Sequence, residues 1–129
     1  MEKIESNGKS VLVVEDEPGI AAVCMRILSR EGFQVDIAVN GEVALEMWRR
    51  KNYDLCLRDI RTPRMNGIEL YRQLEIERPE AIKTFIFTTG DTLSVNVKAF
   101  LEETDRPYLA KPFAPENLRA IVKMAGVAI

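Results

Sequence analysis

Polar side chains able to do chemistry follow four hydrophobic runs of this sequence, each of strand length. They are Glu15 and Asp16 after "SVLVV", Asp59 at the end of "YDLCLRD", Thr89 at the end of "KTFIFTT" and Lys111 after "PYLA". Two like charges about 4 Å apart repel by roughly 4 kcal/mol at an effective dielectric near 20. If the carboxylates cluster, they therefore need positive charge among them. Lys111 supplies one such charge, and a divalent cation would supply more.

The residue types of this set favour one kind of metal and one kind of reaction. The chain has no histidine, and a sparse set of carboxylates favours Mg²⁺, with Mn²⁺ as the alternative, over zinc. Asp59 can then act as a nucleophile toward a phosphoryl group. The metal, Lys111 and the Thr89 hydroxyl would hold the phosphoryl oxygens.

The hydrophobic pattern predicts that these residues do converge, because strand and helix alternate five times along the chain. Strands are predicted at 10–15, 33–39, 53–59, 83–89 and 107–110, and helices at 18–31, 40–50, 66–77, 93–103 and 116–124. Such alternation implies an α/β doubly wound parallel sheet with helices on both faces. In these sheets functional residues gather beyond the carboxyl ends of the strands, which is where the polar set falls.

Composition places the chain among single-domain proteins of the cytoplasm. Its 129 residues suit one domain, for which we expect the bounds 10–126 after a polar tail at 1–9. The tail lacks the apolar core of a signal peptide, and no apolar run is long enough to span a membrane. A net charge of −2 offers no basic stripe for nucleic acid. Cys24 and Cys56 lie in apolar patterns and are predicted to be reduced core thiols.

Four motifs, in order, resemble the receiver domain of two-component response regulators. They are the acidic pair "ED" at 15–16, "RDIRTPRMNG" at 58–67, "TTG" at 88–90 and "KPF" at 111–113. The resemblance covers residues 10–126 and includes chemotaxis regulators. It implies a flavodoxin-like (βα)5 fold whose parallel five-stranded sheet has the order 2-1-3-4-5.

The resemblance also implies a phosphoacceptor and a metal-binding set. Asp59 would receive the phosphoryl group. Asp16 and Asp59 would ligate Mg²⁺ directly, Glu15 would act through water, and the backbone carbonyl of Arg61 would complete the protein ligands.

Further roles follow from the same resemblance. Thr89 and Lys111 would contact the phosphoryl oxygens, and a cis peptide before Pro112 would orient Lys111. Tyr108 matches the aromatic residue that switches position when the family is activated. Its alternative role is packing at the sheet edge.

Three charged residues near Asp59 need separate interpretation. Arg61 and Asp91 would flank the phosphate where the hydrolytic water attacks, and we predict that their pairing modulates the phosphoryl lifetime. The alternative is that both are solvated loop charges. Arg58 stands where the family more often has a small or apolar residue. We expect its charged head to reach solvent over a buried stem, in preference to a modulating role near the phosphate.

The implied function is a phosphorylation switch. A sensor histidine kinase, a histidine phosphotransfer domain or a small phosphodonor would phosphorylate Asp59, and the chain would catalyse only its own phosphorylation and dephosphorylation. The surface of 93–103, 107–110 and 116–124 would then change. The same surface is a candidate homodimer interface. We expect the output, whose effector the sequence does not identify, on another protein or elsewhere in a longer chain, including a hybrid histidine kinase.

Other functions fit the residues less well. A dehalogenase-type phosphatase needs an acid two residues after its nucleophile, where this chain has Arg61. A flavodoxin would bind its flavin phosphate after the first strand, where Glu15 and Asp16 would repel it. The remaining alternative is a phosphorylation-independent interaction module of the same fold.

Overall fold

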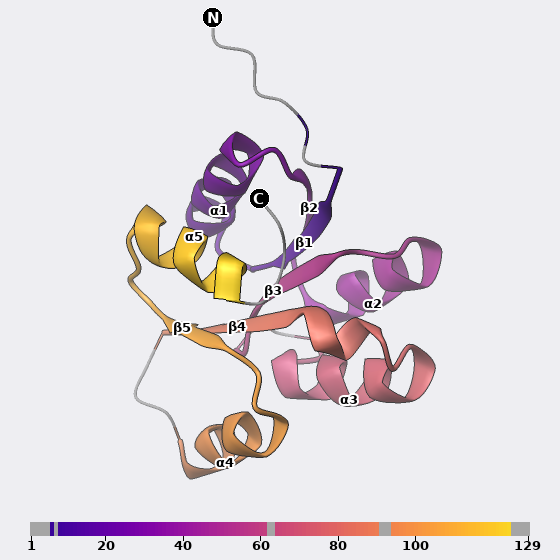
Figure 1. Cartoon of the computed structure of the whole chain (residues 1–129). Helices are drawn as coiled ribbons and strands as arrows, with labels where there is room; N and C mark the ends of the chain where they lie inside the picture. Colours follow the sequence, from indigo (N-terminus) through magenta and orange to yellow (C-terminus); the bar gives the residue numbers. More distant parts are fainter. Residues whose placement is uncertain (1–5, 7, 62–63, 91–93, 125–129) are drawn as a thin grey trace, which may run out of the picture.

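A computed structural model describes residues 6, 8–61, 64–90 and 94–124. One parallel sheet lies at its centre, with the strand order β2-β1-β3-β4-β5 (Figure 1). The strands are β1 (Ser10–Val14), β2 (Gln34–Ala38), β3 (Leu55–Asp59), β4 (Phe85–Thr89) and β5 (Tyr108–Ala110). This order confirms the predicted flavodoxin-like fold.

Each strand is followed by a helix that begins and ends within two residues of the predicted bounds. The helices are α1 (Pro18–Arg30), α2 (Gly41–Arg50), α3 (Gly67–Glu77), α4 (Val95–Thr104) and α5 (Pro115–Met124), and a short 3₁₀ helix, η1 (Ala81–Thr84), precedes β4. Among the described residues, no helix has the length and apolar character needed to cross a membrane.

Polar side chains cap α2, α3 and α4 where these helices begin. The Asn40 side chain accepts a hydrogen bond from the backbone of Val43 at 2.9 Å. Asn66 and Glu69 form a reciprocal capping box at the start of α3. Each cap satisfies helix-terminal N–H groups that have no partner within the helix, and so fixes where the helix begins.

The sheet buries both of its faces, because strand residues alternate between them. Val11, Val13 and Leu57 pack with α1 and α5 on one face. Leu12 and Phe87 pack with α2, α3 and α4 on the other. Cys24 and Cys56 are buried and unpaired, which confirms the prediction of core thiols.

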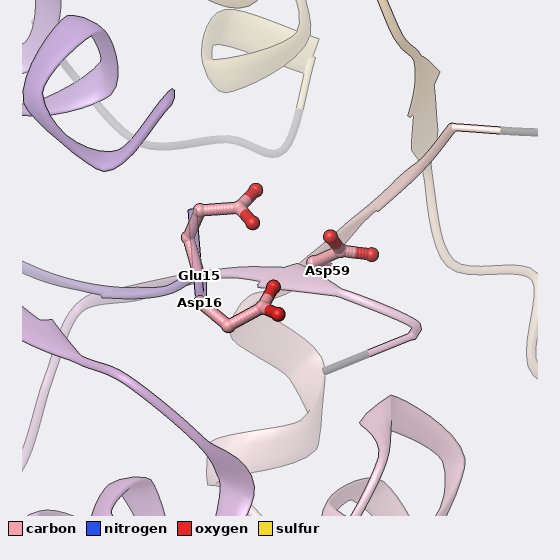
Figure 2. A group of neighbouring side chains, drawn as sticks. All are labelled: Glu15, Asp16 and Asp59. Atoms are coloured by element: carbon pink, nitrogen blue, oxygen red, sulfur yellow. The ribbon is translucent and has the colours of Figure 1, made fainter. Parts of the chain in front are cut away.

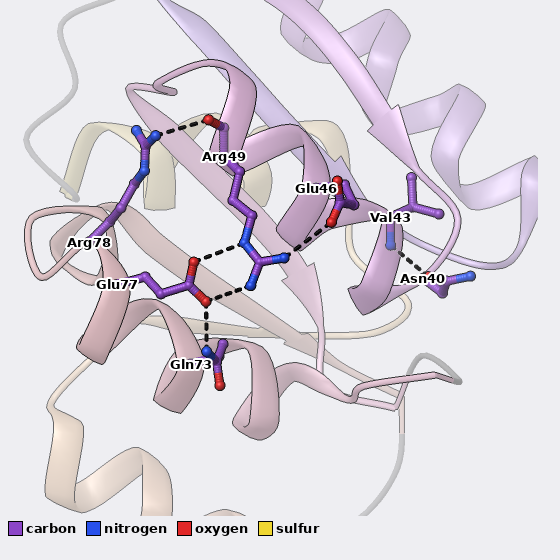
Figure 3. Close-up of polar contacts among 7 residues, drawn as sticks. All are labelled: Asn40, Val43, Glu46, Arg49, Gln73, Glu77 and Arg78. Atoms are coloured by element: carbon purple, nitrogen blue, oxygen red, sulfur yellow. Dashed lines mark hydrogen bonds and ion pairs between the residues drawn. The ribbon is translucent and has the colours of Figure 1, made fainter.

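An exposed polar network joins α2 to α3 (Figure 3). The Arg49 guanidinium donates to both carboxylate oxygens of Glu77 at 2.8 Å, and Gln73 donates to the same carboxylate at 2.6 Å. Arg78 donates to the Arg49 carbonyl at 3.1 Å. Exposed ion pairs add at most about 1 kcal/mol each, so this network contributes little to the stability of the fold.

Candidate functional site

Three carboxylates meet beyond the carboxyl ends of β1 and β3 (Figure 2). Glu15, Asp16 and Asp59 each offer an oxygen, and these oxygens lie within 4.8 Å of one another. Glu15 and Asp16 directly follow β1, Asp59 ends β3, and these two strands are hydrogen-bonded neighbours. Glu15 and Asp59 are buried, whereas Asp16 is exposed. The cluster thus consists of two buried carboxylates and one exposed carboxylate.

Lys111 supplies a positive charge to this cluster from the loop after β5. Its Nζ donates to Glu15 Oε1 at 2.6 Å and to Asp59 Oδ2 at 2.7 Å. The Lys111 backbone N–H donates to the Thr89 carbonyl at 2.8 Å, and the Lys111–Pro112 peptide is cis, as the resemblance implied. These contacts join residues from four different strand ends, those of β1, β3, β4 and β5, in one polar cluster.

Burial and the contacts between Lys111 and the carboxylates act in opposite directions on the pKa values of Glu15 and Lys111. Burial raises the pKa of Glu15, the hydrogen bond from Lys111 lowers it, and the charge of Asp59 raises it further, so that the net direction is upward. Burial alone would lower the pKa of Lys111, but hydrogen bonds to Asp59 and Glu15 outweigh this effect and raise it. One ammonium group therefore faces three carboxylates, and its charge only partly compensates theirs.

The donor set fits a hard divalent cation. The ligand atoms that the cluster offers are carboxylate oxygens, and Mg²⁺ prefers a few carboxylates together with several waters. The Arg61 backbone N–H donates to Asp59 Oδ1 at 3.0 Å, so the chain turns back over this carboxylate directly after β3. The exposed Arg61 residue thus lies beside the cluster.

Thr89 and Tyr108 lie on the face of the sheet that α4 covers. Thr89 ends β4, is buried and pairs with Ala110, while Tyr108 pairs with Phe87. Because strand residues alternate, Phe87, Thr89 and Tyr108 share a face, and the Phe87 ring lies 5.4 Å from the ring of Phe100 in α4. The Tyr108 side chain is half-exposed. Asp91 lies outside the described residues, so its pairing with Arg61 stays a prediction.

The prediction for Arg58 was wrong, because its side chain is fully buried and does not reach solvent. β3 is a central strand, and Arg58 pairs with the buried residues Val14 and Phe87 on either side. Alternation puts its side chain on the face covered by α2 and α3, where Nη2 donates to the Met65 carbonyl. Burial lowers the pKa of Arg58 to about 10, so the guanidinium stays charged at neutral pH. Strand alternation from the buried Cys56 was the signal that could have revealed this.

Comparison with known proteins identifies the family. The family model of the response regulator receiver domain matches residues 11–123. The transcriptional regulatory protein ResD of Bacillus subtilis is 34% identical over 92% of this chain and 48% of its own length. The DNA-binding response regulator MtrA of Mycolicibacterium smegmatis is 35% identical over 88% of this chain and 48% of its own length. The chain thus spans about half the length of these curated relatives.

Solved structures agree with the family match. The Vibrio cholerae chemotaxis protein CheY4 superposes with a TM-score of 0.79 at 26% identity, covering 91% of this chain and 98% of that one. The receiver domain of the Pseudomonas aeruginosa sensor histidine kinase PA1611, solved with a magnesium ion in its active site cleft, has a TM-score of 0.80 at 27% identity. That alignment covers 93% of this chain and 99% of that one. The chain therefore belongs to the response regulator receiver domain family.

Proposed function

We propose that this receiver domain accepts a phosphoryl group on Asp59 in a Mg²⁺-dependent reaction. The contact of Lys111 Nζ with Asp59 Oδ2 at 2.7 Å, inside a carboxylate cluster, is the observation that carries the proposal. A phosphohistidine of a sensor histidine kinase or of a histidine phosphotransfer domain would be the donor. A phosphorylation-independent interaction module is the less favoured alternative, because such a module would not need a lysine paired with an aspartate inside a carboxylate cluster.

The surroundings of Asp59 suit an attacking carboxylate. The Arg61 N–H and the Lys111 ammonium each hold one of its oxygens, and so fix the orientation of the group at the end of β3. An Asp59 oxygen would form a bond to phosphorus as the bond from phosphorus to the donor nitrogen breaks. Lys111 and the Thr89 hydroxyl would then stabilise the charge on the phosphoryl oxygens.

The ligands proposed for Mg²⁺ are Asp16, Asp59 and the Arg61 backbone carbonyl, with Glu15 acting through water. When bound, the metal would neutralise charge on the transferring oxygens. The chain would catalyse only its own phosphorylation and dephosphorylation, in keeping with its place in a signalling family. Arg61 and Asp91 remain the proposed modulators of the phosphoryl lifetime.

The added phosphate would act as a switch on the surface of α4, β5 and α5. It brings negative charge and acceptor oxygens to the rim of the sheet. Thr89 would move toward it, Tyr108 would follow into the vacated space, and partners would read the altered surface. We place the protein in the cytoplasm, where its free thiols stay reduced, and α4, β5 and α5 remain a candidate homodimer interface.

Membership of the family indicates the kinds of partner protein but not the individual partners. A histidine kinase or phosphotransfer domain would supply the phosphoryl group. The output would lie on a separate protein or on another part of a longer chain. The DNA-binding relatives and the kinase-attached receiver represent two such arrangements.

The test is incubation with acetyl phosphate and Mg²⁺, followed by intact-mass measurement. Wild-type protein should gain one phosphoryl group, and Asp59→Asn should gain none. Asp54→Asn is the matched control, because Asp54 lies at the opposite end of β3, where it accepts a hydrogen bond from the Ser10 N–H. Equal labelling of Asp59→Asn and wild type would refute Asp59 as acceptor. Full labelling in the presence of a chelator would refute the metal requirement.

A further inference from the structure

The guanidinium of Arg58 is a buried positive charge with few polar partners. Its side chain is fully buried, and Nη2 donates to the Met65 carbonyl. Nε and Nη1 have no hydrogen-bond partner in the described part of the chain. Among the described residues no carboxylate forms an ion pair with it either. An apolar side chain of similar size would avoid the cost of desolvating this charge, so stability alone does not account for an arginine here.

The carbonyl that Arg58 holds belongs to a strained turn between β3 and α3. Arg64 and Met65 have φ angles of 51° and 70°, in the left-handed region that non-glycine residues rarely adopt. Such backbone persists only where neighbouring groups enforce it. Glu42 N–H donates to the Arg64 carbonyl at 3.1 Å. A Cβ on Gly41 would lie 1.9 Å from the Met65 oxygen, so only glycine allows this approach.

The same loop returns to the end of β3, beside the phosphoacceptor. Gly67 N–H donates to the Ile60 carbonyl at 3.0 Å, and Ile60 N–H donates to the Thr88 carbonyl at 3.0 Å. A Cβ on Gly67 would lie 3.3 Å from Cγ and Nε of Arg58, so glycine leaves room for the arginine stem. Ile60 and Gly67, the two ends of the β3–α3 connection, are thus hydrogen-bonded to each other, and the buried Arg58 contacts the described part of this connection at Met65.

We propose that Arg58 is a positioning residue for the metal site. By holding the Met65 carbonyl, the guanidinium would anchor the described part of the loop next to α3 and so help to orient the backbone of Arg61, whose N–H donates to Asp59 Oδ1. This inference rests on the proposed function, since it assigns to the loop the Arg61 carbonyl ligand. Arg58 itself touches neither the metal nor the phosphoryl group. The buried charge of Arg58 lowers the stability of the fold, but its contact with Met65 orders the loop.

The first test is Mg²⁺ binding to Arg58→Met, measured by calorimetric titration with Mg²⁺ alone. This variant keeps a long side chain and removes every donor. We expect its Kd for Mg²⁺ to rise at least fivefold while its urea midpoint stays equal to that of wild type or rises. A residue that merely supported the fold would instead lower both together. Arg106→Met is the matched control, because Arg106 also donates to a backbone carbonyl, that of Phe85 at 3.0 Å, but at the opposite end of the sheet. Its Mg²⁺ affinity should match wild type.

The second test needs no metal and separates this inference from the proposed function. Hydrogen exchange of the Glu42 and Gly67 amides reports the two bonds that tie the loop down. In Arg58→Met both should exchange at least tenfold faster, while amides of α1 keep their rates. Unchanged exchange at Glu42 and Gly67, a lowered urea midpoint, or wild-type Mg²⁺ affinity in the variant would each overturn the positioning role. If wild type itself binds no Mg²⁺, the proposed function fails, and the exchange rates alone decide whether Arg58 orders the loop.

Discussion

The buried pair of Glu15 and Asp59 shares a single ammonium group. Lys111 Nζ lies 2.6 Å from one carboxylate and 2.7 Å from the other. Two buried carboxylates against one ammonium group leave negative charge that is not compensated. The unmodified site is therefore electrostatically unbalanced toward negative charge, and a divalent cation would correct this.

This imbalance predicts a pH-dependent effect of Glu15→Gln. Burial, first, and the charge of Asp59 raise the pKa of Glu15 above its ordinary value of 4.5, against the hydrogen bond from Lys111. The folded state thus binds more protons than the unfolded state in the window above pH 4.5, and stability falls as pH rises through that window. Glutamine does not undergo this loss. Without divalent ions, the variant should therefore match wild type near pH 4 and be more stable at pH 7, by more than the about 0.5 kcal/mol typical of surface changes.

Urea unfolding at both pH values measures this effect. Glu17→Gln is the control, because Glu17 is an exposed carboxylate two residues further along the same loop. As a change at an exposed surface position, its effect on stability should be small. If Glu15→Gln proves equally or less stable than wild type at pH 7, the negative charge of Glu15 is not a cost to the folded state.

At the level of elements, the backbone at the start of α2 lies in close contact with the backbone of the β3–α3 loop. Gly41→Ala would place a Cβ 1.9 Å from the oxygen and 2.8 Å from the carbon of the Met65 carbonyl. Because both atoms belong to the backbone, relief requires the loop or the helix to move. We expect a loss of about 1–3 kcal/mol in the free energy of unfolding, the usual cost of overpacking, together with weaker Mg²⁺ binding.

Gly19→Ala provides the control for this substitution. Gly19 lies in the first turn of α1, and a Cβ there would meet no atom within 4 Å. Alanine is favoured over glycine in helices by about 0.5–1 kcal/mol, so this variant should be neutral or more stable. Thermal unfolding of both variants measures this difference. Equal changes in stability for Gly41→Ala and Gly19→Ala would contradict the packing argument.

The sequence predicted the elements and the strand-end cluster because both depend on local patterns. Hydrophobic periodicity sets the strands and helices, and a parallel sheet then brings Glu15, Asp59 and Lys111 to one rim. The burial of Arg58 was not predicted, because arginine usually keeps its charged head in solvent. Strand alternation nevertheless places this side chain on a buried face of the sheet. The approach of Gly41 to Met65 was not predictable, because it joins residues distant in sequence that belong to two different crossover connections.

Across the whole molecule, α4 is the helix with the least buried anchorage. Only Phe100 and Leu101 of its described residues are buried. Arg72 of α3 adds an ion pair to Glu103 and lies 5.2 Å from the Phe100 ring. Exposed contacts of this kind add little stability. α4 is therefore suited to shift against the sheet at a low cost in free energy.

The route from Asp59 to this helix predicts the effect of Thr89→Ala. Thr89 and Tyr108 share the sheet face that α4 covers, and the proposed coupling runs through the Thr89 hydroxyl. Alanine removes the hydroxyl but keeps the backbone carbonyl that accepts the Lys111 N–H at 2.8 Å. With acetyl phosphate and Mg²⁺, the variant should still be phosphorylated. Its amide chemical shift changes in α4 and β5 should fall to less than half of those in wild type.

Thr88→Ala tests whether the direction of the side chain matters. Thr88 precedes Thr89 in β4, is equally buried, and lines a space with Leu57 and Phe113 on the α1 and α5 face. A general loosening of β4 would weaken the shift changes in both variants, whereas coupling through the Thr89 hydroxyl weakens them only in Thr89→Ala. Comparison must be made at equal phosphorylation, established by intact mass. If phosphorylated Thr89→Ala reproduces the wild-type shifts in α4 and β5, the hydroxyl does not carry the signal and Tyr108 responds by another path.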